Sequence, residues 1–508
     1  MTRYKKLLLN SSTSVLYQVV ALACGFVLPK LILSNFGSAV NGLVSSITQF
    51  LAIISLCEMG VGSVVQSSLY KPLADKDTDQ ISRIAASSEK FFRGIAFLLV
   101  AYTAVLMGVY PLVTIEDFDY LYTLSLIFVI SISNFAQYYF GMTYAKILSA
   151  DQLGFVNFGL KSFTLILNTV MCAILIKCGA SIHIVKLATS ILFLLRPLVI
   201  AVVVRKKYKI NKKIAITEEP IKQKWNGLAQ HIATVVHGNA PTVVLTLFST
   251  LDNVSVYAVY NLVVNGIKSF MVSLTDGMHS MVGNMLAKNE MKELDNAFDG
   301  FEWFMHTIVT VVFSLMGALI VPFVMVYTRG LTDVSYKVPG FALVFVISEA
   351  VYCLRLPYNI LILSAGHYKQ TQLSSFIEAI ISVVVSVLLV FKLGLLGVAI
   401  GSLCAMLYRT IYLVWYLSRN IVNRKFSIFV KHIIVDAICV AVLVITLCLA
   451  PNFFALQTIS YLGWVVLAIK IGIVCVLESA IINLIFYRKS LQANLAKVAG
   501  KFIKKKPC

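Results

Sequence analysis

The segment FFRGIAFLLVAYTAVLMGVYPLV, residues 91–113, decides the fold class of this chain. Arg93 is its single charged residue, and its apolar residues run on without the alternation of a half-buried strand. A helix that crosses the hydrocarbon core of a bilayer needs about 20 apolar residues. Only helices and closed barrels satisfy their backbone polar groups in that core. The segment therefore predicts a membrane-spanning helix.

Segments of this kind fill most of the chain. Hydrophobic residues make up 59% of it and charged residues 13%, against roughly 25% charged residues in soluble proteins. At about 20 residues a span, we expect an all-α polytopic membrane protein with about fourteen transmembrane helices. The composition excludes a soluble enzyme, a secreted protein and a disordered chain. The expected spans are 11–33, 40–68, 91–113, 119–143, 155–176, 183–204, 227–249, 254–284, 303–328, 338–364, 371–391, 397–418, 431–450 and 459–486.

The positive charges predict the orientation of these spans. The chain has 43 lysines and arginines against 23 acidic residues, a net charge of +20. Most of the cations fall at the N-terminus, in alternate loops and in the C-terminal tail, so topology explains them and no nucleic-acid partner is expected. By the positive-inside rule both termini are expected in the cytoplasm. The opposite loops hold only Lys177, Lys186, Arg329, Lys337 and Lys392.

The two halves of the chain repeat each other. Ile147–Ala150 recurs identically as Ile362–Ala365, and Pro111 matches Pro322 at nearly the same offset. Six spans is an even number, so the copies have the same orientation, and we expect a parallel repeat of two six-helix lobes with a substrate path between them. Further co-linear matches pair Pro29 with Pro241, Leu69 and Lys71 with Leu286 and Lys288, Lys177 with Lys392, and Arg196 with Arg409.

This repeat predicts five parts of the chain. They are an N-terminal lobe at 1–204, a basic cytoplasmic linker at 205–226, a C-terminal lobe at 227–420, helices 13 and 14 at 421–487, and a cytoplasmic tail at 488–508. The tail has apolar residues at helical spacing among lysines, which predicts a basic amphipathic helix on the anionic inner leaflet. A solvated tail is the alternative.

Three cations inside the predicted spans are candidates for contact with a substrate. Lys268 lies near the middle of its span, Arg355 stands beside Pro357, and Lys30 adjoins Pro29. Ionisable groups in hydrocarbon usually face a cavity or a partner, and a cation there suits an anionic group such as phosphate. Four acidic residues could instead bind a coupling cation or balance the lysines, and spacing does not choose: Glu58, Asp276, Glu349 and Glu378.

Polar residues at helical spacing form a stripe along two spans that the repeat makes equivalent. We expect the stripes to line a hydrated central cavity. Helix–helix packing through small and polar residues is the alternative, but it explains Lys268 and Glu58 less easily. The second span carries Asn41, Ser45, Thr48 and Ser55, and the eighth carries Asn261, Asn265 and Thr275.

Motifs of catalysis or metal binding are missing from the sequence. It contains no P-loop, no GxSxG, no HExxH and no paired CxxC, and its ten cysteines lie nearly all in apolar segments. We therefore expect neither an enzyme, nor a metal site, nor a resident cofactor.

Three short motifs in and after the second span resemble those of a known family. They are Phe36-Gly37-Ser38-x-x-Asn41-Gly42-Leu43, Glu58-Met59-Gly60-Val61-Gly62 and Leu69-Tyr70-Lys71-Pro72-Leu73-Ala74. They resemble the Wzx-type O-antigen and capsule flippases of the multidrug/oligosaccharidyl-lipid/polysaccharide exporter superfamily, whose two lobes and two extra helices match the whole chain.

The resemblance implies a flippase of the bacterial cytoplasmic membrane. It would move an undecaprenyl-pyrophosphate-linked oligosaccharide to the outer leaflet by alternating access, for the biosynthesis of surface polysaccharide. Membrane lipids and polysaccharide polymerase or assembly proteins are the implied partners. Whether H⁺ or Na⁺ drives such transport stays open.

Four other functions compete with this interpretation. A lipid II flippase and a MATE-type drug/cation antiporter share the expected superfamily. A permease of the major facilitator class has the same kind of repeat, but its basic loop after the second span is absent here. A membrane-bound glycosyltransferase would need a large extramembrane catalytic loop, which the sequence lacks.

Overall fold

The computed structural model describes residues 3–58, 61–208, 210–211, 228–288, 290–422 and 424–503, and it is all-helical over these ranges. The expected all-α class is confirmed. The helices are α1 Arg3–Ala52, α2 Val61–Asp75, α3 Thr78–Val113, α4 Tyr120–Ala136, α5 Met142–Ala150, α6 Gly154–Lys177, α7 Ile182–Tyr208, α8 Leu228–Phe248, α9 Leu251–Ala287, α10 Met291–Tyr327, α11 Pro339–Leu354, α12 Leu356–Ser364, α13 Gln372–Leu393, α14 Leu395–Asn420, α15 Ser427–Leu449 and α16 Tyr461–Ile503, with a 3₁₀ helix at Ile53–Glu58 and a π-helical turn at Gln137–Gly141.

Eleven helical segments of the described chain are long and apolar enough to cross a membrane. The first, Leu8–Glu58, has 51 residues, far more than the roughly 20 that one crossing needs, and it covers two expected spans. Helices α8 and α9 coincide with the expected seventh and eighth spans, although neither is among the eleven. Large apolar side chains also point outward, with Phe163 64% and Leu388 68% exposed, as a lipid-facing surface requires. The chain is a multi-pass membrane protein.

Gly37, with φ 84° and ψ 174°, divides α1 between the first and second expected spans, in a conformation that glycine adopts at little cost. Three expected spans are themselves interrupted. In the second, α1 is followed by the 3₁₀ helix at Ile53–Glu58. Gln137–Gly141 inserts a π-helical turn between α4 and α5. Arg355 separates α11 from α12, beside Pro357, where proline weakens the helical hydrogen-bond ladder. Such interruptions depend on tertiary packing, so hydropathy alone does not locate them.

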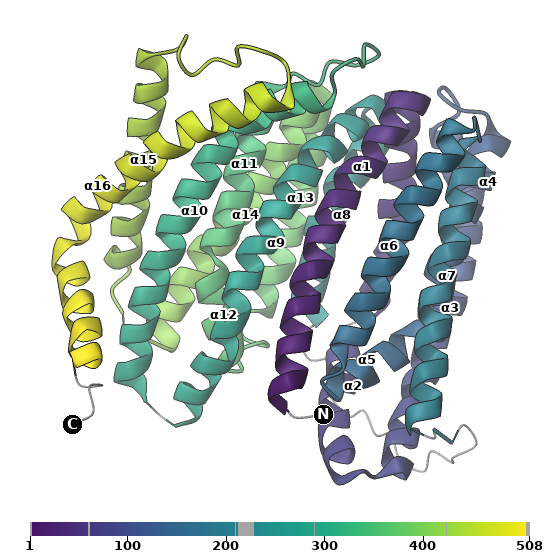
Figure 1. Cartoon of the computed structure of the whole chain (residues 1–508), viewed down its shortest axis with the longest axis horizontal. Coiled ribbons are helices and arrows are strands. Elements are labelled where there is room, and N and C mark those ends of the chain that lie inside the picture. Colours follow the sequence, from purple (N-terminus) through teal and green to yellow (C-terminus); the bar gives the residue numbers. More distant parts are fainter. Residues whose placement is uncertain are drawn as a thin grey trace. The chain divides into compact units, whose positions relative to one another are not determined.

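Contacts divide the chain into two compact units. Unit 1 comprises Met1–Leu262, Gly330–Val334 and Ser375–Val398, and unit 2 comprises Val263–Arg329, Ser335–Ser374 and Ala399–Cys508. In unit 1, α1 packs on α6, and α4 packs on α3 and α7 (Figure 1). In unit 2, α10 packs on α11, α15 and α16. These units describe packing, whereas the predicted lobes describe a sequence repeat, and the lobe boundaries stay a prediction.

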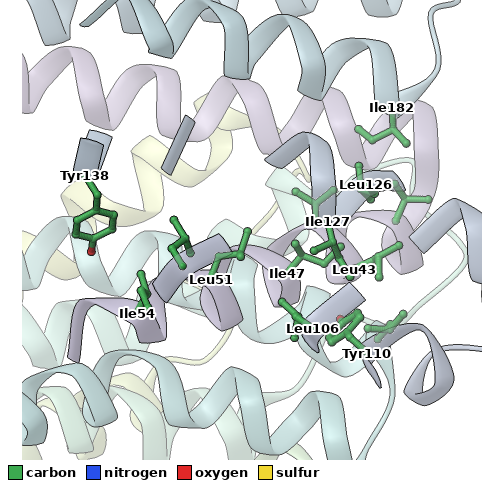
Figure 2. Close-up of a cluster of buried hydrophobic side chains, with 14 of the residues drawn as sticks. Leu43, Ile47, Leu51, Ile54, Leu106, Tyr110, Leu126, Ile127, Tyr138 and Ile182 are labelled. Atoms are coloured by element: carbon green, nitrogen blue, oxygen red, sulfur yellow. The ribbon is translucent and has the colours of Figure 1, made fainter. Parts of the chain in front are cut away.

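The core of unit 1 lies around the second half of α1. Leu43, Ile47 and Leu51 recur at steps of four, are fully buried, and pack against Leu126 of α4 and Leu106 of α3 (Figure 2). This spacing puts all three on one helix face. The apolar face of α1 therefore fixes the position of its polar residues.

The motif around Gly37 forms a junction within unit 1. The backbone N–H of Ser38 donates to the Asp333 carboxylate at 2.7 Å, and Asn41 donates to Ser255 at 2.9 Å. Although desolvation raises the pKa of Asp333, the hydrogen bonds from Ser38 outweigh it, and the net pKa is lowered. At Gly42 an added Cβ would lie 1.9 Å from the carbonyl oxygen of Leu251, so the two backbones touch there.

The sequence repeat has a counterpart in side-chain contacts. In unit 1 the Tyr144 hydroxyl of α5 donates to Glu89 of α3. In unit 2 the Tyr358 hydroxyl of α12 donates to Glu302 of α10. The two tyrosines precede the repeated Ile-Leu-Ser-Ala tetrapeptides by three residues in one copy and four in the other. The equivalent cations of the predicted repeat also make similar contacts. Arg196 donates to Thr164 and to the Lys161 carbonyl in the first half of α6, and Arg409 donates to Ser374 and to the Thr371 carbonyl at the start of α13.

Two predicted segments fall largely outside the described residues. Of the linker at 205–226, residues 209 and 212–226 are not described. Helix α16 is irregular at Tyr487 (φ −117°, ψ 15°) and then continues to Ile503 (Figure 1). The side chains of 489–508, which would form the predicted amphipathic face, lie outside the described residues.

Replacement of Gly42 by alanine should destabilise the protein by about 2 kcal/mol or more, because the methyl group overlaps the backbone at Leu251. The matched control is Gly159→Ala in α6, where an added Cβ meets nothing within 4 Å. It should leave stability unchanged or raise it by about 0.5–1 kcal/mol. Thermal unfolding of the detergent-purified variants measures both, and equal melting temperatures would refute the close contact.

Candidate functional site

An ion pair inside unit 2 joins two of the residues that the sequence singles out. The Lys268 Nζ atom of α9 lies 3.0 Å from Glu349 Oε2 of α11, and their side chains are 19% and 4% exposed. Glu349 belongs to Pro339–Ser364, one of the segments able to cross a membrane. A charge at such a position is costly unless it is balanced. The carboxylate of Glu349 therefore balances the charge of Lys268.

One tyrosine ring brings the second candidate cation to the same place. Lys268 Nζ lies 5.0 Å from the centroid of the Tyr352 ring, and the Arg355 guanidinium carbon lies 4.7 Å from that centroid. Both distances are within cation–π range. Tyr352 is one helical turn after Glu349 on α11, and Arg355 is at the α11–α12 break. The structure thus assembles Lys268, Glu349, Tyr352 and Arg355, which we call the α9–α11 cluster.

Two of the four members of this cluster are cations. Lys268 pairs with Glu349, and Arg355 is buried, with 8% of its surface exposed. A guanidinium stays charged in proteins. Two cations brought together in poorly solvated surroundings can bind an anion such as phosphate.

Lys30, the third candidate cation, lies in α1 and belongs to unit 1. Its residue is half-buried, and it follows Pro29 inside the helix. The structure does not join it to the α9–α11 cluster, whose residues all belong to unit 2. Its role stays a prediction.

The polar stripe of the second span takes part in contacts between helices. Asn41 is 5% exposed and bonds Ser255. Its neighbour Ser46 bonds Thr246 at 2.6 Å and accepts from Tyr110 at 2.7 Å. Ser45 is half-buried.

The rest of the two stripes is less uniform. Thr48 is exposed, and its hydroxyl bonds the Val44 carbonyl of its own helix. The Ser55 carbonyl lies 2.7 Å from His231 Nε2. In the eighth span Asn261 and Asn265 are half-buried, and Thr275 is buried and bonds the Val272 carbonyl. In the second-span stripe Asn41 and Ser55 therefore hold helices together, whereas in the eighth span the bond of Thr275 stays within its own helix. The hydrated cavity stays a prediction.

The four acidic candidates have different surroundings. Glu349 pairs with Lys268, and Glu58 accepts from the Tyr138 hydroxyl at 2.7 Å. Glu378 of α13 is 2% exposed. The side chain of Asp276 lies outside the described residues. Within the described chain no group of His, Cys, Asp or Glu is placed to hold a metal ion.

Sequence reasoning missed two clusters of charged side chains. One surrounds Glu89, where Arg93 contacts the carboxylate at 2.5 Å and Arg205 donates to Tyr144 at 2.6 Å. The other surrounds Glu302. Both glutamates precede the apolar runs of α3 and α10 and were therefore not counted as intramembrane charges. Comparison of Glu89 and Tyr144 with Glu302 and Tyr358 along the repeat would have found them.

Comparison with known proteins identifies the fold. The lipid II flippase MurJ in an inward closed conformation matches with a TM-score of 0.68 over 95% of this chain and 100% of that chain, at 14% identity. An inward-facing multidrug resistance MATE family transporter of the MOP superfamily gives 0.56 over 78% and 94%, at 13% identity. The outward-facing conformation of such a transporter gives 0.54 over 82% and 93%, at 15% identity.

No model of a protein family matches the chain, and no curated protein is significantly similar to it in sequence. At these identities the structural matches show a shared fold. The chain has a MurJ/MATE-like membrane fold, whereas the Wzx-type family stays a prediction.

The Lys268–Glu349 pair predicts strongly coupled effects of substitution. Lys268→Met leaves the buried Glu349 carboxylate without its lysine, which should cost about 3–5 kcal/mol. The double variant K268M/E349Q should unfold at a higher temperature than K268M, since no charge of the pair remains. Lys207→Ala is the control, because its pair with Asp151 is 44% and 25% exposed and should contribute about 1 kcal/mol or less. The pairing would be contradicted if the change in melting temperature of the double variant equalled the sum of the changes of K268M and E349Q.

Proposed function

We propose that this chain is a flippase that moves a polyprenyl-pyrophosphate-linked oligosaccharide across the bacterial cytoplasmic membrane by alternating access, for the biosynthesis of surface polysaccharide. Both termini would lie in the cytoplasm, as the distribution of lysine and arginine predicts. The protein would act as a transporter and not as an enzyme, and polysaccharide polymerase or assembly proteins would receive its product. The flippase and transporter folds that the chain shares support this class of function.

One observation carries the proposal: two intramembrane cations converge on one tyrosine ring in the α9–α11 cluster. Lys268 and Arg355 both contact the Tyr352 ring, and Lys268 also pairs with Glu349. A pyrophosphate group offers several anionic oxygens, and a guanidinium can bind two of them at once. When such a group arrives, it competes with Glu349 for Lys268. Binding of the substrate would thus break the ion pair between Lys268 and Glu349.

The remaining candidates have supporting roles in this proposal. The exposed and half-buried members of the polar stripes would line the hydrated path of the saccharide. Lys30 would offer a further contact for the anionic group. Glu58, Asp276, Glu349 and Glu378 stay candidates for a coupling ion, H⁺ or Na⁺.

A lipid II flippase is the second candidate function. The match to the lipid II flippase MurJ covers 95% of this chain and 100% of that chain. The match to the inward-facing MATE transporter covers 78% of this chain and 94% of that chain. This fuller match favours a lipid-linked saccharide over a small cationic drug. The two cations of the cluster also disfavour a cationic substrate.

The double variant K268A/R355A should flip lipid-linked oligosaccharide at least about tenfold more slowly than the wild type, since each charged hydrogen bond contributes about 1.5–3 kcal/mol. The assay reconstitutes the full chain in liposomes and measures accessibility of the labelled saccharide in each leaflet. Lys392→Ala, at an exposed position near the end of α13, is the control and should flip at the wild-type rate.

The same assay separates the candidate functions. Flipping of lipid II but not of lipid-linked oligosaccharide would favour the second candidate. Movement of cationic dyes without flipping of either lipid would favour the antiporter. Wild-type flipping by a stably folded K268A/R355A variant would refute the assignment of the α9–α11 cluster.

A further inference from the structure

A buried cluster of titratable side chains lies in unit 2, away from the residues assigned above. Glu302 of α10 is fully buried and accepts from the Tyr358 hydroxyl. Arg424 contacts Glu302 at 2.5 Å and Asp299 at 2.6 Å. The Asp299 side chain is 58% exposed, so this end of the cluster reaches solvent. We call this set, with the two histidines described next, the α10–α15 cluster.

Two histidines extend the cluster to the last two helices. His306 Nδ1 lies 2.5 Å from the Asp436 carboxylate of α15, and His306 Nε2 lies 3.5 Å from the Tyr358 oxygen. His432 Nε2 lies 3.4 Å from Glu302, and its Nδ1 lies 2.6 Å from the Tyr487 hydroxyl of α16. The two imidazole rings stack with centroids 4.9 Å apart. His306 and His432 are 2% and 4% exposed.

The two copies of the repeat differ in one charged position, where the first copy has Arg93 and the second has His306. Glu89 and Arg93 of α3 correspond to Glu302 and His306 of α10, at the same offset along the chain. Arg93 contacts Glu89 at 2.5 Å and carries a permanent charge. Histidine instead changes its charge between about pH 5 and 8. The second copy thus holds a titratable group where the first holds a fixed cation.

Charge balance decides how many protons the second copy takes up. Besides the exposed Asp299, the cluster has two carboxylates, Glu302 and Asp436, and one guanidinium, Arg424. With both imidazoles neutral it carries one net negative charge in poorly solvated surroundings, which is unfavourable. One proton on the histidines removes this charge. A second proton would place like charges 4.9 Å apart in the stacked rings.

We propose that His306 and His432, held between Glu302 and Asp436, form a proton-binding site that takes up a single proton and so fastens α15 and α16 to α10. In the protonated state His306 donates from Nδ1 to Asp436 and from Nε2 to Tyr358, whose hydroxyl donates to Glu302. Loss of the proton leaves the two carboxylates balanced by Arg424 alone. The helices α15 and α16 lie beyond the duplicated part of the sequence, so the site joins them to the repeated scaffold.

The site is surrounded on every side by groups that take part in this balance. Asp299 and Glu302 face it from α10, and Tyr358 faces it from α12. Arg424 lies before the start of α15, and Asp436 and Cys439 lie on α15. Tyr487 faces the site from α16, and the Lys431 Nζ atom lies 4.7 Å from the centroid of the Tyr487 ring. Of these, Asp299 and Lys431 are solvent-exposed. The cluster therefore reaches the aqueous phase at its Asp299 end.

The proposal predicts how stability depends on pH. Histidine side chains change charge between about pH 5 and 8. Because the proposed proton stabilises the folded state, the melting temperature of the purified full-length protein should fall as pH rises across this range. His306→Arg reproduces the fixed cation of Arg93 and should abolish this fall. His306→Gln should reduce it as well, and serves if the arginine is too large. His183→Gln should retain it, because His183 contacts the Tyr122 carbonyl and no carboxylate.

Melting temperatures of H306R and H306Q that fall with pH as in the wild type would overturn the proposal. This readout does not depend on the function proposed above. A second readout does: in liposomes that flip lipid-linked oligosaccharide, the flipping rate of the wild type should vary over the same pH range, and that of H306R should not. Absence of flipping in all proteins, with the pH-dependent melting intact, would refute the proposed function and leave the proton site standing.

Discussion

Charge compensation inside an apolar surrounding is the constraint on which this structure depends. A helix in hydrocarbon satisfies its own backbone, but an ionised side chain must find a counter-charge, a hydrogen-bond donor or water. Lys268 finds Glu349, and Glu302 finds Arg424 and Tyr358. Because these partners lie on different helices, each pair also fixes one helix against another. Helices that seem interchangeable by hydropathy thereby acquire specific neighbours.

Two clusters meet this constraint in different ways. The α9–α11 cluster brings two cations to one tyrosine ring, which suits an incoming anion. The α10–α15 cluster has an excess of negative charge unless an imidazole takes a proton. The glutamate–tyrosine contact of the second cluster has a counterpart in the first half of the chain, where Arg93 occupies the position that corresponds to His306 in the predicted repeat. The first half thus has a permanently charged side chain where the second has an imidazole.

Hydropathy and cation distribution predict the helical membrane class, because long apolar runs have few alternatives in a bilayer. They also single out Lys268 and Arg355, because depth in a span follows from sequence. They do not predict that Glu349 pairs with Lys268 or that Tyr352 lies beneath both cations, since contacts between helices depend on tertiary packing. The interruptions at Ile53–Glu58 and Gln137–Gly141 are missed for the same reason. Glu302 is missed because it stands at the edge of an apolar run, where a charge looks solvated.

The central claim is that the chain recognises the anionic group of a lipid-linked saccharide, and binding to the wild-type protein tests it most directly. Native mass spectrometry of the full chain in nanodiscs would compare a polyprenyl-pyrophosphate-linked saccharide with a polyprenyl glycoside of the same length that lacks phosphate. The account predicts that the pyrophosphate lipid binds at least about tenfold more tightly, a difference of about 1.4 kcal/mol. Equal binding of the two lipids would contradict it.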